Sequence, residues 1–90
     1  MKIEYDSRKA ALNLQKHGVS FEEAETVFYD PLLLTKEDKA IVHEQRFLST
    51  GISDKGNVLV VVWTLRDDSI RIISAWRADK QKREYYEKQY

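Results

Sequence analysis

Apolar residues recur with a helical period at the start of the chain and with a strand period after it. Before residue 30 they return every three or four positions, which predicts one helix ending near His17 and a second from Phe21 to about Tyr29. Ile3 to Tyr5 is expected to form a short strand ahead of both helices, and Asp6 can cap the first helix. Asp30-Pro31 ends the second helix, because the residue before a proline is biased away from helical backbone.

The rest of the chain has the pattern of strands joined by turns. The clearest is Val58 to Arg66, a β-branched apolar run typical of a central strand, with turn-forming residues at 54–57 and 67–69 on either side. The expected strands are 32–35, 58–66 and 70–78, with a charged loop at 36–40 and a mixed stretch at 43–53. Asp79 can cap a terminal helix. On that helix Lys82, Arg83, Tyr86 and Tyr90 lie near one side.

This order of elements predicts an α+β fold, in which an antiparallel sheet packs against two N-terminal helices and a C-terminal helix follows. Residues 1–90 are expected to form a single domain with one core. A content of 42% hydrophobic and 33% charged residues is typical of a globular protein. The chain has no cysteine, no run of about 18 apolar residues and no apolar signal region at its start. We therefore expect a cytoplasmic protein that has no disulfide and no contact with membranes.

The net charge is zero, but the charges are unevenly distributed. Lysine and arginine outnumber acids in residues 1–17 and 66–90, whereas residues 18–65 carry eight acids against four bases. Such a layout can present a small phosphate-binding patch and a separate acidic surface for a basic partner. Ordinary solvated surface charge has the same composition. A protein coated with positive charge is excluded.

The junction between the two helices combines a stop signal with a start signal. Gly18 can take the left-handed backbone conformation that closes a helix ending at His17. Ser20 can cap the next helix, with Glu23 completing a capping box. His17 can thus orient this junction or contact a ligand. No metal site or cofactor is expected, because His17 and His43 are far apart in sequence and no glycine-rich phosphate loop is present.

Alternation predicts which residues of the two long strands share a face. The expected core positions are Leu59, Val61, Trp63 and Leu65 in one strand and Ile70, Ile72, Ser74 and Trp76 in the other. The opposite face then carries Arg66, Arg71, Ala75 and Arg77, and Arg46 could join them beside Glu44. If the strands pair in a register that places these four arginines side by side, they form a basic patch on an open sheet. In another register they are separate charges exposed to solvent.

A patch of guanidinium groups suits RNA cleavage without a metal. Attack of a ribose 2′-OH on the adjacent phosphate builds charge on the nonbridging oxygens, and planar, permanently charged donors can stabilise it. A proton acceptor and a proton donor are also needed. The candidates are His17, Glu44, Lys9 and Tyr86. A histidine suits the role because its charge changes near neutral pH.

The string KHGVSFEEA at residues 16–24 resembles the signature of BrnT-type toxins of bacterial type II toxin–antitoxin systems. The resemblance continues at Glu44-x-Arg46, in the apolar run 58–62 and in RIISAWRA at 71–78. It implies a RelE-like fold and a ribonuclease that blocks translation. On this interpretation the catalytic residues are Arg71, Arg77, Arg46, His17 and Glu44, and the RNA-binding residues are Lys9, Lys16, Arg66 and Tyr86.

One departure from the family pattern concerns Trp76, where BrnT-type toxins commonly carry a basic residue. The tryptophan could stack on an RNA base. It could equally lie in the core, as strict strand alternation favours.

The resemblance also implies a partner, a ribbon–helix–helix antitoxin of the BrnA type. The expected assembly is two toxins around an antitoxin dimer, which binds operator DNA through the antitoxin alone. The acidic middle of the chain, with the apolar residues 32–34, is expected to dock a basic or amphipathic antitoxin segment. Two alternatives to the ribonuclease remain: a non-catalytic module that holds RNA or protein, and a degenerate toxin that acts only in autoregulation with its antitoxin.

Overall fold

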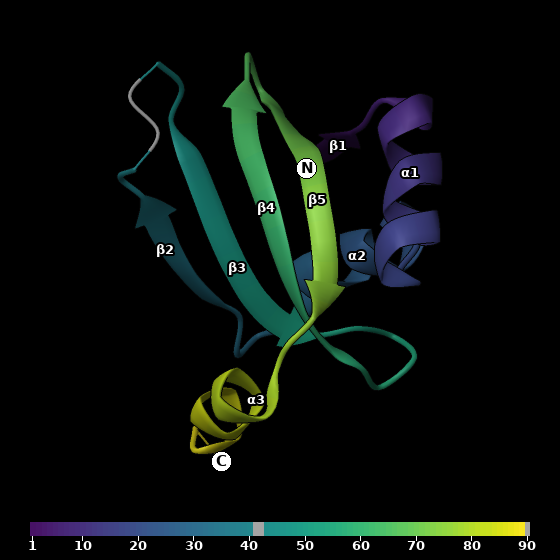
Figure 1. The fold of residues 1–90 in the computed structure, drawn as a ribbon. Helices are drawn as coiled ribbons and strands as arrows, with labels where there is room; N and C mark the ends of the chain where they lie inside the picture. The colour runs from purple at the N-terminus through teal and green to yellow at the C-terminus, as the bar shows by residue number, and fades with distance from the viewer. Residues whose placement is uncertain (41–42, 90) are drawn as a thin grey trace.

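A computed structural model describes residues 1–40 and 43–89 of the chain (Figure 1). In chain order the elements are β1 (Lys2–Glu4), α1 (Ser7–His17), α2 (Phe21–Thr26), the 3₁₀ helix η1 (Val27–Tyr29), β2 (Leu34–Asp38), β3 (Arg46–Ile52), β4 (Val58–Arg66), β5 (Ser69–Arg77) and α3 (Lys80–Glu87). The strands form one sheet in the order β1-β5-β4-β3-β2. β1 runs parallel to β5, and the other pairs are antiparallel. The predicted α+β class is confirmed.

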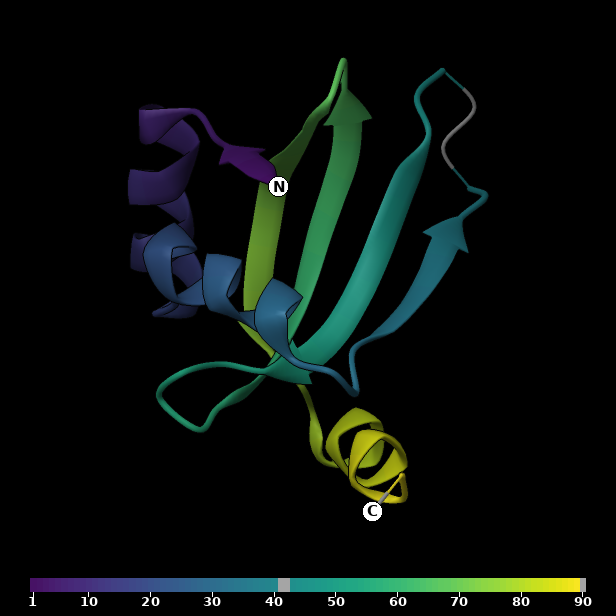
Figure 2. The ribbon, with the colours of Figure 1, turned by 180° about the vertical axis from the view of Figure 1, so that it is seen from behind.

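The helices are unevenly placed around this sheet. α2 and η1 cover one face, α1 runs beside the β5 edge, and α3 lies at the end of the sheet where β5 finishes (Figures 1 and 2). The second face is open over most of its area, and α3 borders it at one end. A groove of about 430 Å³ separates α3 from this open face, with Leu34, Leu48, Val60 and Tyr85 among its lining residues. None of the described helices is long and apolar enough to cross a bilayer.

The helix boundaries follow the predicted caps. Asp6 accepts bonds from the backbone N–H groups of Arg8 and Lys9 at the start of α1, and Gly18, at φ 70°, closes its end. The Ser20 hydroxyl accepts the N–H of Glu23 at 3.0 Å. The predicted capping box is only half formed, however. The Glu23 carboxylate turns away from Ser20 and binds the β3–β4 turn, as described below.

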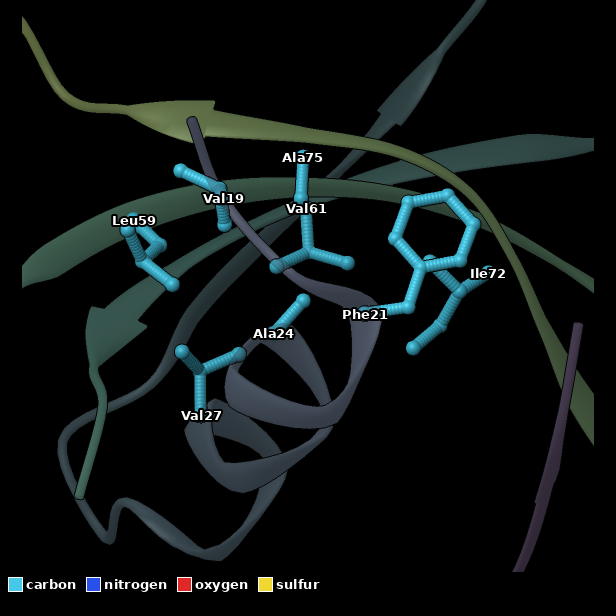
Figure 3. Packing of buried hydrophobic residues seen from close by; sticks show 8 residues of the cluster. All are labelled: Val19, Phe21, Ala24, Val27, Leu59, Val61, Ile72 and Ala75. Atoms are coloured by element: carbon cyan, nitrogen blue, oxygen red, sulfur yellow. The ribbon is translucent and has the colours of Figure 1, made fainter. Parts of the chain in front are cut away.

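The core lies between α2 and the covered face of the sheet (Figure 3). Its buried members are Val19, Phe21, Ala24, Val27, Leu59, Val61, Ile72 and Ala75. Burial of a side chain the size of valine, leucine or phenylalanine contributes about 1.5–3 kcal/mol, so this cluster is the main source of stability. Two of the predicted core positions in β4, Leu59 and Val61, are fully buried, whereas Leu65 is 56% exposed and was assigned to the core wrongly.

A β-bulge changes the facing of residues in β5. Val62 pairs with Ser74, but the next residue of β4, Trp63, pairs with Ile72, so Ile73 is passed over. One extra residue in a strand reverses the alternation beyond it. Ala75 therefore lies in the core and Trp76 lies on the open face, opposite Val60. The predicted assignment of these two residues was wrong for this reason.

The boundaries of β2 and of the second helix also differ from the prediction, and β1 and β5 each begin one residue earlier than expected. β2 begins at Leu34 and continues to Asp38, through part of the expected charged loop, because each of its residues pairs with β3. Charged side chains are tolerated there since β2 is the edge strand. The second helix changes to 3₁₀ geometry at Val27. Tyr90, predicted to extend one side of the last helix, lies outside the described residues.

Candidate active site

The site begins with the attachment of α1 to the sheet edge. β1 pairs only with residues 69–71 of β5, so the rest of that edge has no strand beside it. The buried side chain of Asn13 takes this place: its Nδ2 donates to the carbonyls of Ala75 at 2.8 Å and Val19 at 3.0 Å, and its Oδ1 accepts the N–H of Ala75 at 3.1 Å. These bonds fix the C-terminal turn of α1 beside the last residues of β5.

This attachment brings together two segments that are distant in sequence. The ring of His17, the last residue of α1, lies 6.0 Å from the ring of Trp76, centroid to centroid, at an angle of 43°. A shallow, open concavity of about 700 Å³ extends around them. It is lined by Lys16, His17, Ser74, Trp76 and Arg77. The KHG and SAWRA motifs thus form one surface, with two cations, an imidazole, a hydroxyl and an indole.

Neither cation of this concavity has a carboxylate partner in the part of the chain that the structure describes. Within residues 1–40 and 43–89, the ion pairs closer than 4.0 Å are Arg46 with Glu44, at 3.0 Å, and Arg71 with Glu4, at 3.5 Å. Lys16 and Arg77 are exposed and take part in neither. Their charges are therefore available to an anionic ligand.

Arg77 also acts at a distance on a buried acid. Burial raises the pKa of Glu23. The hydrogen bonds from Ser53 and Asn57, together with the charges of Lys55 and Arg77, lower the pKa by a larger amount, so the net pKa is below the usual range. The Glu23 carboxylate accepts the Ser53 hydroxyl at 2.6 Å and the Asn57 amide at 2.8 Å. Glu23 thereby holds the β3–β4 turn against α2, a structural role.

The predicted patch of four arginines is divided by the fold. Arg46, Arg66 and Arg71 lie on the open face near the end of the sheet that holds the β4–β5 turn: Arg46 pairs with Asp38, Arg71 with Thr64, and Arg66 is two residues beyond Thr64. Arg77 pairs with Leu59 and so points to the other face. It lies six residues along β5 from Arg71, about 20 Å at strand spacing. Only the first three arginines form a cluster.

The other predicted residues fall outside the concavity. Glu44 is bound to Arg46 and is therefore remote from His17. Lys9 is exposed on α1, seven residues before Lys16, so the two lie on one side of the helix about 10 Å apart. Tyr86 is 1% exposed, and its hydroxyl donates to Asp30, which anchors α3 to the chain after η1. Such a buried side chain does not fit the predicted contact with RNA.

Asp30 is the acceptor at the centre of this second anchor. Burial raises the pKa of Asp30. The hydrogen bonds from Tyr86 and from the N–H groups of Ile52 and Leu32 lower the pKa by a larger amount, so the net pKa is below its usual range. The charged carboxylate therefore ties together α3, the end of β3 and the turn that precedes β2.

The sequence prediction missed Asn13 and placed Trp76 on the wrong face. An asparagine in the middle of a helix was the available signal for the first, because its side chain competes with helical hydrogen bonds and commonly serves another backbone segment. The bulge had no comparable signal. In the described part of the chain, no three His, Cys, Asp or Glu side chains gather as metal ligands would.

Comparison with known proteins identifies the family and the fold of the chain. The profile of the family described as "Ribonuclease toxin, BrnT, of type II toxin-antitoxin system" matches residues 5–82. The fold is similar to that of the Brucella abortus ribonuclease toxin, BrnT, with a TM-score of 0.64 and 22% sequence identity over 89% of this chain and 99% of that one. No curated protein sequence matches the chain. With the matched profile spanning most of its length, the chain belongs to the BrnT family of ribonuclease toxins of type II toxin–antitoxin systems.

Proposed function

We propose that this toxin is a metal-independent endoribonuclease that cleaves cellular RNA, and so inhibits translation, at the concavity between α1 and β5. The observation that carries the proposal is the meeting of His17 with two cations, Lys16 and Arg77, that have no acidic partner among the described residues. Cleavage by a 2′-OH requires a group that transfers protons and positive charge that stabilises the phosphate oxygens. The imidazole of His17 and the two cations can supply these.

In the proposed reaction His17 accepts the proton of the ribose 2′-OH as its oxygen attacks the adjacent phosphorus. Arg77 and Lys16 stabilise the charge that develops on the nonbridging oxygens. The bond from phosphorus to the 5′-oxygen then breaks, and the imidazolium returns its proton to that oxygen. The products are a 2′,3′-cyclic phosphate and a 5′-hydroxyl end. Proton transfer contributes about 10²–10⁴ in rate, and each charge-stabilising donor about 10²–10³.

The open-face arginines have a supporting role in this proposal. Arg46 and Arg71 are each compensated by a carboxylate, and Glu44 is occupied by Arg46. A compensated charge offers less to a developing oxyanion than a free one does. We therefore assign Arg46 and Arg71 to the RNA strand beyond the scissile phosphate. Arg66 is assigned there too, because it lies beside them at the β4–β5 turn, away from His17. Lys9 extends the positive surface along α1.

The experiment is cleavage of a defined RNA by purified toxin in the presence of EDTA, with end-group analysis. Cleavage should persist in EDTA, leave 2′,3′-cyclic phosphate ends and disappear in His17→Ala. Expression of the toxin alone should stop growth and lower bulk protein synthesis. Growth that continues in the presence of folded toxin would favour the degenerate alternative. RNA binding without cleavage would favour the non-catalytic module.

A toxin of a type II system has a cognate antitoxin. We infer a ribbon–helix–helix antitoxin, two copies of each chain in the complex, and docking of an antitoxin segment in the groove beside α3. Leu34, Leu48 and Tyr85 give this groove an apolar floor, and Lys36 and Lys82 line it as well. An amphipathic segment with acidic flanks fits this lining better than a basic one. Tyr85→Glu should abolish co-purification of the antitoxin and leave RNA cleavage unchanged, because Tyr85 lies outside the concavity.

A further inference from the structure

We propose that Trp76 is a stacking platform for a nucleobase next to the scissile phosphate. This inference rests on the proposed function, since it adds a base-binding subsite to the same concavity. The ligand class is a base of single-stranded RNA, held by its flat face and without selection for its identity.

The β-bulge is the first observation behind it. Without the extra residue at Ile73, Trp76 would face the core together with Ile72. With it, the indole lies on the open face, half-buried, at the rim where α1 covers the edge of β5. Bulges re-aim side chains, and they are over-represented beside active sites.

The second observation is the contrast between the two tryptophans. The indole N–H of Trp63 donates to the Ser49 hydroxyl at 2.8 Å, and its ring stacks on Phe47. The indole N–H of Trp76 has no hydrogen-bond partner among the described residues. The N–H of a buried tryptophan usually has a protein partner, as that of Trp63 does. The N–H of Trp76 instead reaches solvent beside the concavity, where a ligand can meet the indole.

The third observation is the set of neighbours. His17 contacts one side of the indole, and Lys16 and Arg77 line the same concavity. Aromatic platforms in single-strand binding proteins are combined with cations that hold the adjacent phosphates in this way. A base stacked on Trp76 therefore sits next to the phosphate that His17 and Arg77 would act on.

The test uses a short RNA whose cleavage site has been mapped with the wild-type toxin. Trp76→Leu keeps an apolar side chain but removes the stacking face, and Tyr29→Leu, which removes an aromatic ring that is 70% exposed outside the concavity, is the matched control. Loss of one stacking contact should raise KM about 10- to 100-fold with a smaller change in kcat. An RNA that is abasic beside the scissile phosphate should show the same loss with wild-type toxin and little further loss with Trp76→Leu. Equal KM values for the wild type and Trp76→Leu would overturn the proposal.

A binding measurement separates this inference from the proposed function and from any folding defect. A 2′-O-methyl RNA of the same sequence cannot be cleaved, because its 2′-oxygen carries no proton. Its binding should quench tryptophan fluorescence in the wild type but not in Trp76→Phe, where only Trp63 remains. If the wild type binds with quenching and never cleaves unmodified RNA, the ribonuclease proposal fails and the base subsite stands. Absence of binding, or quenching that persists in Trp76→Phe, eliminates the subsite.

Discussion

The side chain of Asn13 pairs with both backbone groups of Ala75, with Nδ2 donating to the carbonyl at 2.8 Å and Oδ1 accepting the N–H at 3.1 Å. This is the pairing that a neighbouring strand would supply, made by one amide at an edge where β1 is too short to reach. The same bonds set the position of the C-terminal turn of α1, and with it the position of His17 relative to Trp76.

Replacement of Asn13 should therefore affect both stability and the site. Asn13→Ala leaves the buried N–H and C=O of Ala75 without partners, and each such group costs about 1–3 kcal/mol. Urea unfolding should report this loss, and RNA cleavage by the remaining folded protein should fall as His17 loses its position. Asn13→Asp keeps an acceptor for the Ala75 N–H but places a buried carboxylate against the carbonyl oxygens of Ala75 and Val19, so at neutral pH its loss of stability should be at least as large. Wild-type stability in Asn13→Ala would show that the edge of β5 needs no such partner.

Arg77 and Arg71 should behave differently although they lie on one strand. Arg77→Ala should lower kcat about 10²–10³-fold, because in the proposed reaction Arg77 stabilises the charge that develops on the phosphate. Arg71→Ala should mainly raise KM and reduce the salt dependence of RNA binding, because its charge is shared with Glu4. Arg77→Ala should melt close to the wild type, since an exposed charge contributes little to stability. Arg71→Ala should melt somewhat lower, because it removes the partner of Glu4 in a partly buried pair. Steady-state kinetics decides the point, with the exposed Arg83→Ala as control. A larger loss of kcat in Arg71→Ala than in Arg77→Ala would move the active site to the arginines near the β4–β5 turn.

Glu23 should make the toxin sensitive to acid. Its pKa is lowered in the folded state from an ordinary value of 4.5, so folding favours the charged form. The stabilisation is complete above the ordinary pKa and is lost as the pH falls through the lowered one. Urea unfolding between pH 7 and pH 3 should show this loss, to which Asp30 adds by the same argument. In Glu23→Gln the protein should be less stable at neutral pH and its stability should change less on acidification. An identical pH slope in the wild type and Glu23→Gln would exclude this group as the cause.

Tyr86→Phe separates anchoring from RNA contact. The substitution removes only the hydroxyl that donates to Asp30, a bond to a charged acceptor worth about 1.5–3 kcal/mol. The melting temperature should fall, and RNA cleavage per folded molecule should be unchanged, since the ring is buried. A loss of cleavage without loss of stability would restore Tyr86 to the RNA-binding set.

Binding of operator DNA tests whether the antitoxin alone contacts the duplex. The isolated toxin should bind its operator duplex negligibly at physiological salt, because its net charge is zero and its middle segment is acidic. The complex with antitoxin should bind tightly, through the antitoxin. Gel-shift measurements with toxin alone, antitoxin alone and the pair check this, and specific retention of the operator by the toxin alone would contradict it.

Local signals in the sequence determined the helices, most of the strands and the family, whereas β3 lay in a stretch whose alternation was mixed. The caps at Asp6 and Ser20 and the helix stop at Gly18 are formed as predicted, because they depend on residues within one turn. The turn chemistry around Val58 to Arg66 likewise placed that strand correctly. The motif KHG could be recognised without any tertiary information.

The composition of the site was decided only by tertiary structure. A single extra residue, Ile73, placed Trp76 outside the core and Ala75 inside it. No local signal in the sequence indicates which residue of a strand will form a bulge. Strand register separated Arg77 from Arg46, Arg66 and Arg71, because register depends on the partner strands rather than on the strand itself. The bonds from Asn13 to Ala75 and from Tyr86 to Asp30 join residues 62 and 56 positions apart. Contacts at such separation follow from how the elements pack, which is why the sequence indicated the candidate residues but not which of them share a surface.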